Sequence, residues 1–224
     1  MKVGIVGCMG RMGQLLVRNV IAHQETELSG GIDRPDSKDI GKDLGVIVGA
    51  PETGVFVSND ASDLFMSSDV IIDFTTPAAT VKHAALARDT DTSLVIGTTG
   101  LSDEDNQKIR DVADTVCIVK AGNMSIGINL LTFVIEELSR NLNDHYDIEI
   151  TEMHHRDKID APSGTALMLG EAAAKGKGLS LPDLAAFDRS GVSKPRSKRE
   201  IGFTSLRGGD VIGDHSVIFA GKGE

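Results

Sequence analysis

The chain contains 224 residues, and its 33 Asp and Glu residues against 23 Lys and Arg residues give a formal net charge of −10. A globally acidic chain is a poor partner for nucleic acid or an anionic membrane, and the absence of tryptophan argues against a base-stacking platform. No apolar run approaches the length of a membrane span, the sequence opens on a strand pattern rather than a signal peptide, and only two cysteines occur. We therefore expect a cytoplasmic protein with reduced thiols that forms one large or two modest domains.

A strand, a glycine-rich loop and a helix open the chain. Residues 2–6 are apolar, glycines follow at positions 7, 10 and 13, and apolar residues then recur at helical spacing. Such glycines allow a tight turn and close approach of the backbone to a pyrophosphate, as in dinucleotide-binding proteins. The spacing G-x-x-G-x-x-G is a weak signal alone, and a tight turn without a ligand is the alternative. The dinucleotide-binding interpretation is strengthened by the next strand, residues 28–32, which ends at Asp33. A carboxylate at that position can bind the adenosine ribose diol.

Arg34 bears on the choice of cofactor. Asp33 repels a 2′-phosphate, whereas a guanidinium beside it can pair with one, so NADH and NADPH both remain open. The alternative role for Arg34 is that of a solvated loop arginine. Residues 35–54, rich in Gly, Asp and Pro, are expected to form an irregular connection.

Strands and helices then alternate up to residue 119. Helices are expected from Pro77 to about Arg88 and after the N-cap Ser102. The apolar strand patterns between them cover residues 69–74, 93–96 and 115–119. This alternation predicts a parallel sheet with helices on both faces, a Rossmann-type doubly wound α/β domain.

The loops that follow the strands are candidate ligand sites. In parallel sheets ligands bind outside the carboxyl ends of the strands, which puts residues 7–13, 97–100 and 121–124 on one edge. For Thr98 and Thr99 ordinary loop chemistry is an open alternative.

The alternation of short strands and helices ends near Met124. We therefore expect a dinucleotide-binding domain over residues 1–124 and an α+β substrate-binding and oligomerisation domain over residues 125–224. Its first element is a long amphipathic helix, residues 125–142. Residues 175–200 are expected to form an exposed, mobile loop, and residues 201–221 alternate like an antiparallel hairpin that turns at Arg207–Asp210.

A cationic segment, residues 152–167, is the most distinctive part of the chain. After a strand at residues 146–150 it carries His154, His155, Arg156 and Lys158, and Ser163 then caps a helix. Histidines can donate protons near neutral pH, and a helix start offers free N–H groups to an anion, so the segment suits a carboxylate substrate that needs a proton. A solvated charged turn is one alternative. A metal site is disfavoured, because adjacent histidines on a strand point to opposite faces and there is no second His/Cys cluster.

These motifs together resemble the 4-hydroxy-tetrahydrodipicolinate (dihydrodipicolinate) reductase family over essentially the whole chain. The EMHHRDKIDAPSGTA segment is highly specific, whereas the glycine loop is not. The matching segments are GxxGRMG at 7–13, GTTG at 97–100, AGNMSIGIN at 121–129, EMHHRDKIDAPSGTA at 152–166 and RGGDVIGDHSVIFAG at 207–221.

The resemblance implies a reductase of the diaminopimelate route to lysine, which delivers a hydride from NADH or NADPH to a cyclic, unsaturated dicarboxylate. His154 matches the family's general acid/base and Lys158 its proton donor. For the substrate, the resemblance implies carboxylate contacts from His155 and from the helix start at Ser163, Gly164 and Thr165. For the cofactor, it implies Gly7, Cys8, Met9, Gly10, Arg11 and Met12 at the pyrophosphate, Asp33 and Arg34 at the ribose, and Gly97, Thr98, Thr99, Ala121, Gly122, Asn123 and Met124 along the nicotinamide.

The resemblance also implies a homotetramer built through the second-domain sheet. The family continues beyond the position of Glu224 with a further strand and a helix that return to the first domain, whereas this sequence ends at AGKGE. Two other functions stay open from the residues alone: another Rossmann oxidoreductase acting on an amino or keto acid, and a dinucleotide-sensing module without turnover. The cationic segment speaks against the sensor, which has no need of a histidine–lysine pair.

Overall fold

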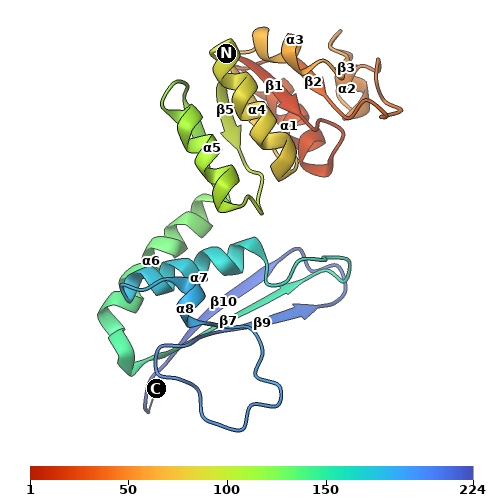
Figure 1. Cartoon of the computed structure of the whole chain (residues 1–224). Helices are drawn as coiled ribbons and strands as arrows, with labels where there is room; N and C mark the ends of the chain where they lie inside the picture. Colours follow the sequence, from red (N-terminus) through yellow and green to blue (C-terminus); the bar gives the residue numbers. More distant parts are fainter. Residues whose placement is uncertain (224) are drawn as a thin grey trace. The chain divides into compact units, whose positions relative to one another are not determined.

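A computed structural model describes residues 1–223, apart from the side chain of Asn143. The chain divides into two compact units, Met1–Ala121 and Gly122–Glu224. Each unit has its own sheet, its own helices and its own buried apolar cluster, so each is described by itself below (Figure 1).

The first unit is a parallel sheet of six strands in the order β3-β2-β1-β4-β5-β6. The chain reverses its direction of travel across the sheet between β1 and β4, and doubly wound sheets bind their ligands at such a point. This confirms the predicted Rossmann-type fold. The strands are β1 (Lys2–Val6), β2 (Glu27–Ile32), β3 (Val57–Ser58), β4 (Val70–Asp73), β5 (Ser93–Ile96) and β6 (Ile118–Lys120).

Helices cover both faces of this sheet, because its strands are apolar on both sides. One buried cluster includes Ile5 and Val17, and the other includes Phe65, Ile71 and Leu94. The helices are α1 (Arg11–Ala22), α2 (Leu44–Ile47), α3 (Ala61–Met66), α4 (Pro77–Thr90) and α5 (Asp103–Ala113).

Two local expectations in this unit have different outcomes. Ser102 caps α5 as predicted, in a capping box with Asp105. Residues 35–54 are not wholly irregular, since α2 lies within them. Buried Asp43 caps α2 and also accepts hydrogen bonds from the backbone of Thr53 and Gly54, which ties this connection together.

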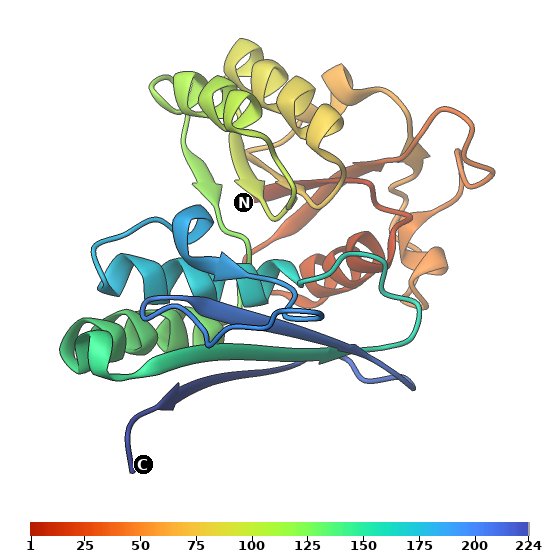
Figure 2. The ribbon, with the colours of Figure 1, turned by 60° about the horizontal axis from the view of Figure 1, so that its bottom comes forward.

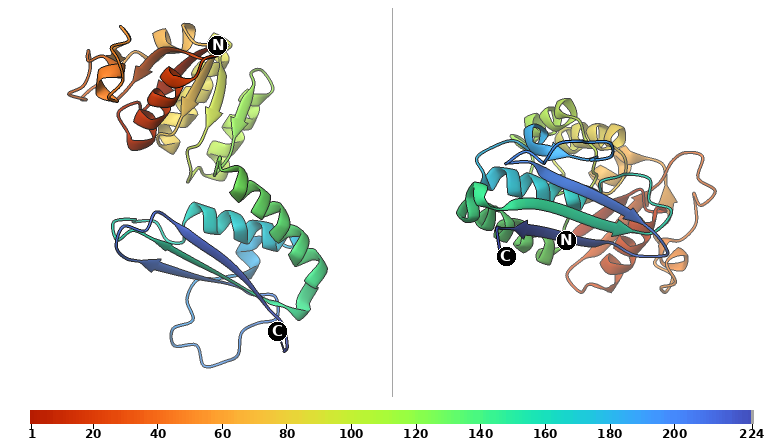
Figure 3. Two further views of the ribbon diagram at one scale, coloured as in Figure 1. Left: turned by 180° about the vertical axis from the view of Figure 1, so that it is seen from behind. Right: turned by 90° about the horizontal axis from the view of Figure 1, so that it is seen from below.

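The second unit packs two long helices on one face of a four-stranded sheet (Figures 1 and 3). Alternate residues of β7, among them Ile148 and Ile150, are buried against this helical layer. Its elements are α6 (Ile126–Leu142), the 3-10 helix η1 (Asn143–His145), β7 (Asp147–His154), α7 (Gly164–Gly176), α8 (Leu181–Leu184), β8 (Ala185–Ala186), β9 (Ile201–Arg207) and β10 (Asp214–Ala220).

The expected terminal hairpin is wrong. The sheet order is β10-β7-β9-β8, so β9 and β10 do not pair with each other but flank β7, parallel on one side and antiparallel on the other (Figure 2). The turn after Arg207 passes over the end of β7 instead, where Gly208 donates to the His154 carbonyl and Arg156 donates to that of Gly209. Alternation in sequence identified both strands, but their common partner β7 lies far upstream, 53 residues before β9 and 61–73 residues before β10 in the paired positions.

Residues 175–200 also differ from the expected loop. The segment includes the end of α7, the helix α8 with buried Leu181, and the short strand β8. The remainder is a largely exposed loop (Figure 3). Arg196 anchors this loop to Glu149 on β7, with 2.7 Å between the guanidinium and the carboxylate. Among the described residues, no helix is both long and apolar enough to cross a membrane.

Candidate active site

The glycine loop of the first unit is built for close backbone approach. Gly7 has a φ of 68°, in the left-handed region that favours glycine, and its carbonyl accepts from the Gly10 N–H at 3.0 Å. A Cβ on Gly13 would collide with the Gly7 carbonyl, so only glycine allows α1 to begin this close to β1. The loop therefore brings backbone N–H groups to the start of a helix, which is a favourable place for a phosphate.

Of the other predicted loop residues, Met9 lines a cavity while Arg11 and Met12 are exposed on α1. The side chain of Cys8 is fully buried among Val3, Ile5 and their neighbours, so only its backbone can serve a ligand. Burial, together with the negative charge of Asp33, raises the pKa of the Cys8 thiol to about 12.

A cavity of about 770 Å³ lies along the carboxyl edge of the first sheet. Its volume and its lining suit an adenine dinucleotide, because the glycine cradle and the carboxylate of Asp33 border the same space. Arg34 also borders it, with a side chain 81% exposed whose nearest acidic neighbour is Asp36 at 4.0 Å. The predicted residues that line the cavity are Gly7, Met9, Gly10, Asp33 and Arg34.

The sequence missed a buried polar centre beneath this cavity. Asp73, the last residue of β4, is fully buried and accepts from the N–H and hydroxyl of Thr75 at 2.9 and 2.6 Å. Its other oxygen lies 2.8 Å from Nδ1 of His83, which must donate to an ionised carboxylate. Burial alone raises the pKa of Asp73, but hydrogen bonds from His83 and Thr75 outweigh it and lower the pKa below its ordinary value of 3.8. Thr75 and His83 both line the cavity, so Asp73 holds part of its wall.

The two threonines of the GTTG loop, residues 97–100, differ in burial. The Thr98 hydroxyl is buried, donates to Asp73 at 3.3 Å and accepts from Thr80 at 2.8 Å, so its side chain is committed to the scaffold. Gly97 lies over the Phe74 ring, where a Cβ would collide, whereas the side chain of Thr99 is exposed. The ordinary loop role thus holds for the side chain of Thr98.

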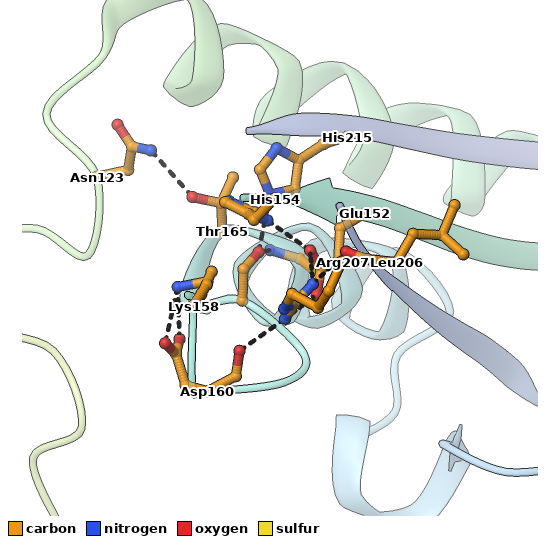
Figure 4. Close-up of polar contacts among 11 residues, drawn as sticks. Asn123, Glu152, His154, Lys158, Asp160, Thr165, Leu206, Arg207 and His215 are labelled. Atoms are coloured by element: carbon orange, nitrogen blue, oxygen red, sulfur yellow. Dashed lines mark hydrogen bonds and ion pairs between the residues drawn. The ribbon is translucent and has the colours of Figure 1, made fainter. Parts of the chain in front are cut away.

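In the second unit, the predicted cationic loop begins later than expected. His154 is the last residue of β7 and is largely buried, and its Nδ1 lies 2.5 Å from Oε2 of Glu152 (Figure 4). Arg207 on β9 donates to both oxygens of Glu152, at 2.9 and 2.8 Å. Sequence reasoning did not single out Glu152 or Arg207, because their pairing depends on strands far apart in the chain.

Lys158 lies in the loop itself, with Nζ 2.8 Å from both carboxylate oxygens of Asp160. The hydrogen bond from Lys158 lowers the pKa of Asp160, which stays ionised. His155 is partly exposed and Arg156 is exposed. Two basic side chains of this segment, those of His154 and Lys158, thus have carboxylate partners within the chain.

The start of α7 forms beside these groups. Ser163 caps the helix by accepting from the Ala166 N–H at 3.1 Å, and its hydroxyl also lies 2.8 Å from Nε2 of His215 on β10. The N–H groups of Gly164 and Thr165 have no acceptor within the helix and are available to an anion. This confirms the predicted N-cap and leaves an anion-binding helix start in the same unit as His154 and Lys158.

Residues 121–124 span the division between the two units. Ala121 ends the first and donates its N–H to Ile96 at 3.1 Å. In the second unit, the Asn123 amide donates to the Thr165 hydroxyl at 3.1 Å, which links residues 122–124 to the start of α7 (Figure 4). The Met124 side chain is exposed.

Comparison with known proteins decides the family. A family model described as "Dihydrodipicolinate reductase, N-terminus" matches residues 1–124, and one described as "Dihydrodipicolinate reductase, C-terminus" matches residues 127–224. The chain belongs to the dihydrodipicolinate reductase family. It is therefore an oxidoreductase that uses NADH or NADPH.

Similar proteins carry the same description. A 4-hydroxy-tetrahydrodipicolinate reductase of Rhizobium rhizogenes is 51% identical over 225 residues, which cover 100% of this chain and 82% of the relative. One from Brucella abortus is 48% identical, with 100% and 84% covered. The solved structure of dipicolinate-bound dihydrodipicolinate reductase from Paenisporosarcina sp. TG-14 superposes with a TM-score of 0.70 at 27% identity and covers 100% of this chain and 84% of that one.

The reductase thus keeps its candidate groups in two sets. The first unit holds the dinucleotide cradle, and the second holds the His154–Lys158 segment and the helix start. Among residues 1–223, no group of three or more His, Cys, Asp or Glu side chains is arranged to hold a metal ion.

Proposed function

We propose that this reductase converts 4-hydroxy-tetrahydrodipicolinate to tetrahydrodipicolinate in the biosynthesis of diaminopimelate and lysine, with the roles of its residues as follows. The observation that carries the proposal is the grouping of His154, Lys158 and the open start of α7 in one unit of a chain whose other unit has a dinucleotide cradle. A dicarboxylate substrate needs both anion binding and a proton, and this grouping supplies both.

The bound nicotinamide supplies the hydride, and the chain supplies orientation and the proton. Reduction of a conjugated imine adds the hydride at one carbon and requires a proton at its neighbour, so a donor must lie within hydrogen-bond reach. Lys158 is the proposed donor, since a positive group near a dicarboxylate also stabilises charge that develops as the hydride arrives. Substrate binding must then draw Nζ away from Asp160, whose side chain is 65% exposed and can turn to solvent.

His154 is the proposed acid/base group that sets protonation and orients the substrate. His155 is proposed to contact one substrate carboxylate, and the N–H groups of Gly164 and Thr165, with Ser163 holding the helix start, the other. The Asn123–Thr165 hydrogen bond supports a role for residues 121–124 beside this site.

For the cofactor, we propose that both NADH and NADPH bind, with NADH favoured or equal. Asp33 selects the ribose diol, and the exposed Arg34 offsets its repulsion of a 2′-phosphate. The backbone of residues 7–12 is proposed to hold the pyrophosphate, and Gly97, Thr99 and residues 121–124 to lie along the nicotinamide. Thr98 is proposed to act there through its backbone.

We also propose a homotetramer that assembles through the second sheet. Within the described chain, α6 and α7 cover one face of this sheet and no helix covers the other, where Leu206 and Ile218 are 46% and 49% exposed. An uncovered apolar sheet face favours self-association. A cytoplasmic location fits the two cysteines, both of which are free.

The test is oxidation of NADH by the full chain, followed by absorbance, with and without the cyclic dicarboxylate. Substrate-dependent oxidation is expected. Oxidation only with another amino or keto acid would indicate a different Rossmann oxidoreductase, and NADH binding without turnover would indicate a sensor. Either result would overturn the proposal.

A further inference from the structure

Glu152 is a buried carboxylate that the mechanism above does not use. It is 1% exposed and lies on the core-facing side of β7, two residues before His154 and therefore on the same face. In Figure 4 it stands between the His154 ring and the Arg207 guanidinium. Burying an ion is costly unless it is fully paired, so a purely structural position would favour an uncharged residue.

The partners of Glu152 keep it ionised. Burial raises the pKa of Glu152, but hydrogen bonds from Arg207, Ser205 and His154 outweigh that effect and lower the pKa to about 2. Arg207 itself is fixed by a further bond from Nη2 to the Asp160 carbonyl at 2.7 Å. A bidentate guanidinium holds a carboxylate in one plane, which fixes the direction in which Oε2 points.

The contact with His154 then determines where the imidazole carries its proton. An ionised carboxylate only accepts hydrogen bonds, so a separation of 2.5 Å requires the proton on Nδ1. Nε2 carries no proton in this neutral tautomer and is left to exchange a proton with the substrate. The chain passes close to Nε2 at Gly213, where a Cβ would lie 2.8 Å from it. The absence of a side chain at Gly213 keeps that side of the ring open.

We infer that Glu152 is a positioning residue that holds His154 in the Nδ1–H tautomer, while Arg207 holds Glu152. This inference rests on the proposed acid/base role of His154. In each proton transfer Nε2 gains or loses one proton, the ring charge changes between 0 and +1, and the Nδ1 proton stays on the ring. Glu152 remains an anion throughout.

The charges around His154 come from several elements. Besides Glu152 on its own strand and Arg207 on β9, His215 on β10 lies edge-on with ring centroids 5.1 Å apart. Burial and the neighbouring His154 lower the pKa of His215, which therefore adds no charge near neutral pH. Asp214 and Lys158 bring opposite charges to the surroundings of His215. Glu152 is the only carboxylate within hydrogen-bond distance of the His154 ring in the described chain.

Glu152→Gln tests the inference because it removes the charge and one of the two oxygens that accept from Arg207. Oε2 accepts from Arg207 and also faces Nδ1 of His154, so either orientation of the amide turns its NH₂ group toward an Arg207 donor and breaks the arrangement that holds the Nδ1 proton. The expected result is a fall in kcat of about 10²–10⁴-fold with a much smaller change in KM. NADH affinity should be unchanged. Glu152→Asp, which keeps the charge, should recover part of the loss.

The matched control is Glu171→Gln, which makes the same change at an exposed carboxylate on α7. It should retain wild-type kcat. Equal losses in the two variants, or normal turnover in Glu152→Gln, would overturn the inference.

A second measurement reads the tautomer in the wild type and does not depend on activity. Nitrogen NMR of the histidine-labelled full chain, with His154 assigned by its loss in His154→Asn, should report a proton on Nδ1 and a bare Nε2 above the range where the ring is charged. A proton on Nε2 with bare Nδ1 in the wild type would overturn the inference. If instead the wild type shows the predicted tautomer but does not oxidise NADH with the cyclic dicarboxylate, the proposed function fails and the positioning role of Glu152 stands.

Discussion

Removal of the Asp73 carboxylate should destabilise the first unit and weaken cofactor binding together. Asp73→Ala deletes the acceptor for Thr75, Thr98 and His83. The Thr75 N–H keeps the Thr98 hydroxyl as its acceptor at 3.1 Å, but the Thr75 hydroxyl, the Thr98 hydroxyl and His83 Nδ1 lose the acceptor that orients them. Each orphaned donor costs about 1–3 kcal/mol, so the free energy of unfolding should fall by about 3–9 kcal/mol.

The assay is urea unfolding of the full chain followed by circular dichroism. The transition that NADH moves to higher urea belongs to the cofactor unit, because a ligand stabilises only what it binds. Asp89→Ala is the matched control, a surface carboxylate near the end of α4 that is 60% exposed. NADH affinity should fall in Asp73→Ala and not in the control, since Thr75 and His83 line the cavity.

The same variant has a predictable pH dependence. The pKa of Asp73 in the folded chain lies below its ordinary value of 3.8, so the ion favours the folded state. That contribution is fully present above the unfolded value and is lost as the pH falls through the folded value. The stability difference between wild type and Asp73→Ala should therefore be constant above about pH 5 and shrink in more acidic solution. Equal stability of Asp73→Ala and Asp89→Ala at neutral pH would refute the reasoning.

Three further outcomes are expected. Arg34→Ala should weaken NADPH binding more than NADH binding, by about 1.5–3 kcal/mol for one charge-assisted hydrogen bond, and equal losses in cofactor titrations would contradict the proposed preference. At neutral pH a thiol reagent should modify exposed Cys117 and leave Cys8 intact, because Cys8 is buried and its pKa is raised to about 12; peptide mass spectrometry that finds Cys8 modified first would contradict this. Leu206→Asp should reduce the assembly mass measured by light scattering, whereas Val46→Asp, the same kind of change at an exposed apolar residue of the first unit, should not; a wild type that is a stable monomer would exclude the proposed tetramer.

The parts of the fold that were predicted from sequence rest on local signals. The glycine loop and Asp33 belong to one strand–helix–strand unit, and the caps Ser102 and Ser163 act within three residues of themselves. The resemblance to the reductase family rests on contiguous motifs and is confirmed by the family models.

The parts that were not predicted depend on pairing between distant segments. The wrong hairpin arose because alternation identifies a strand but not its neighbour, and β7 separates β9 from β10. Glu152 meets Arg207 only through the β7–β9 register, and Asp73 meets Thr98 only across two adjacent strands. A carboxylate at a core-facing position of a strand was the available signal for both, since such a group requires partners that the local sequence does not supply.

The central claim is that the cationic segment of the second unit provides the proton while the first unit holds the cofactor. Steady-state kinetics and NADH titration of Lys158→Ala test it most directly, with Lys175→Ala as a control that removes a 73% exposed lysine from the last turn of α7. The predicted result is a fall in kcat of about 10²–10⁴-fold in Lys158→Ala, with NADH affinity and the control unchanged. Normal turnover in Lys158→Ala, or a loss of NADH binding as large as the loss of activity, would contradict the account.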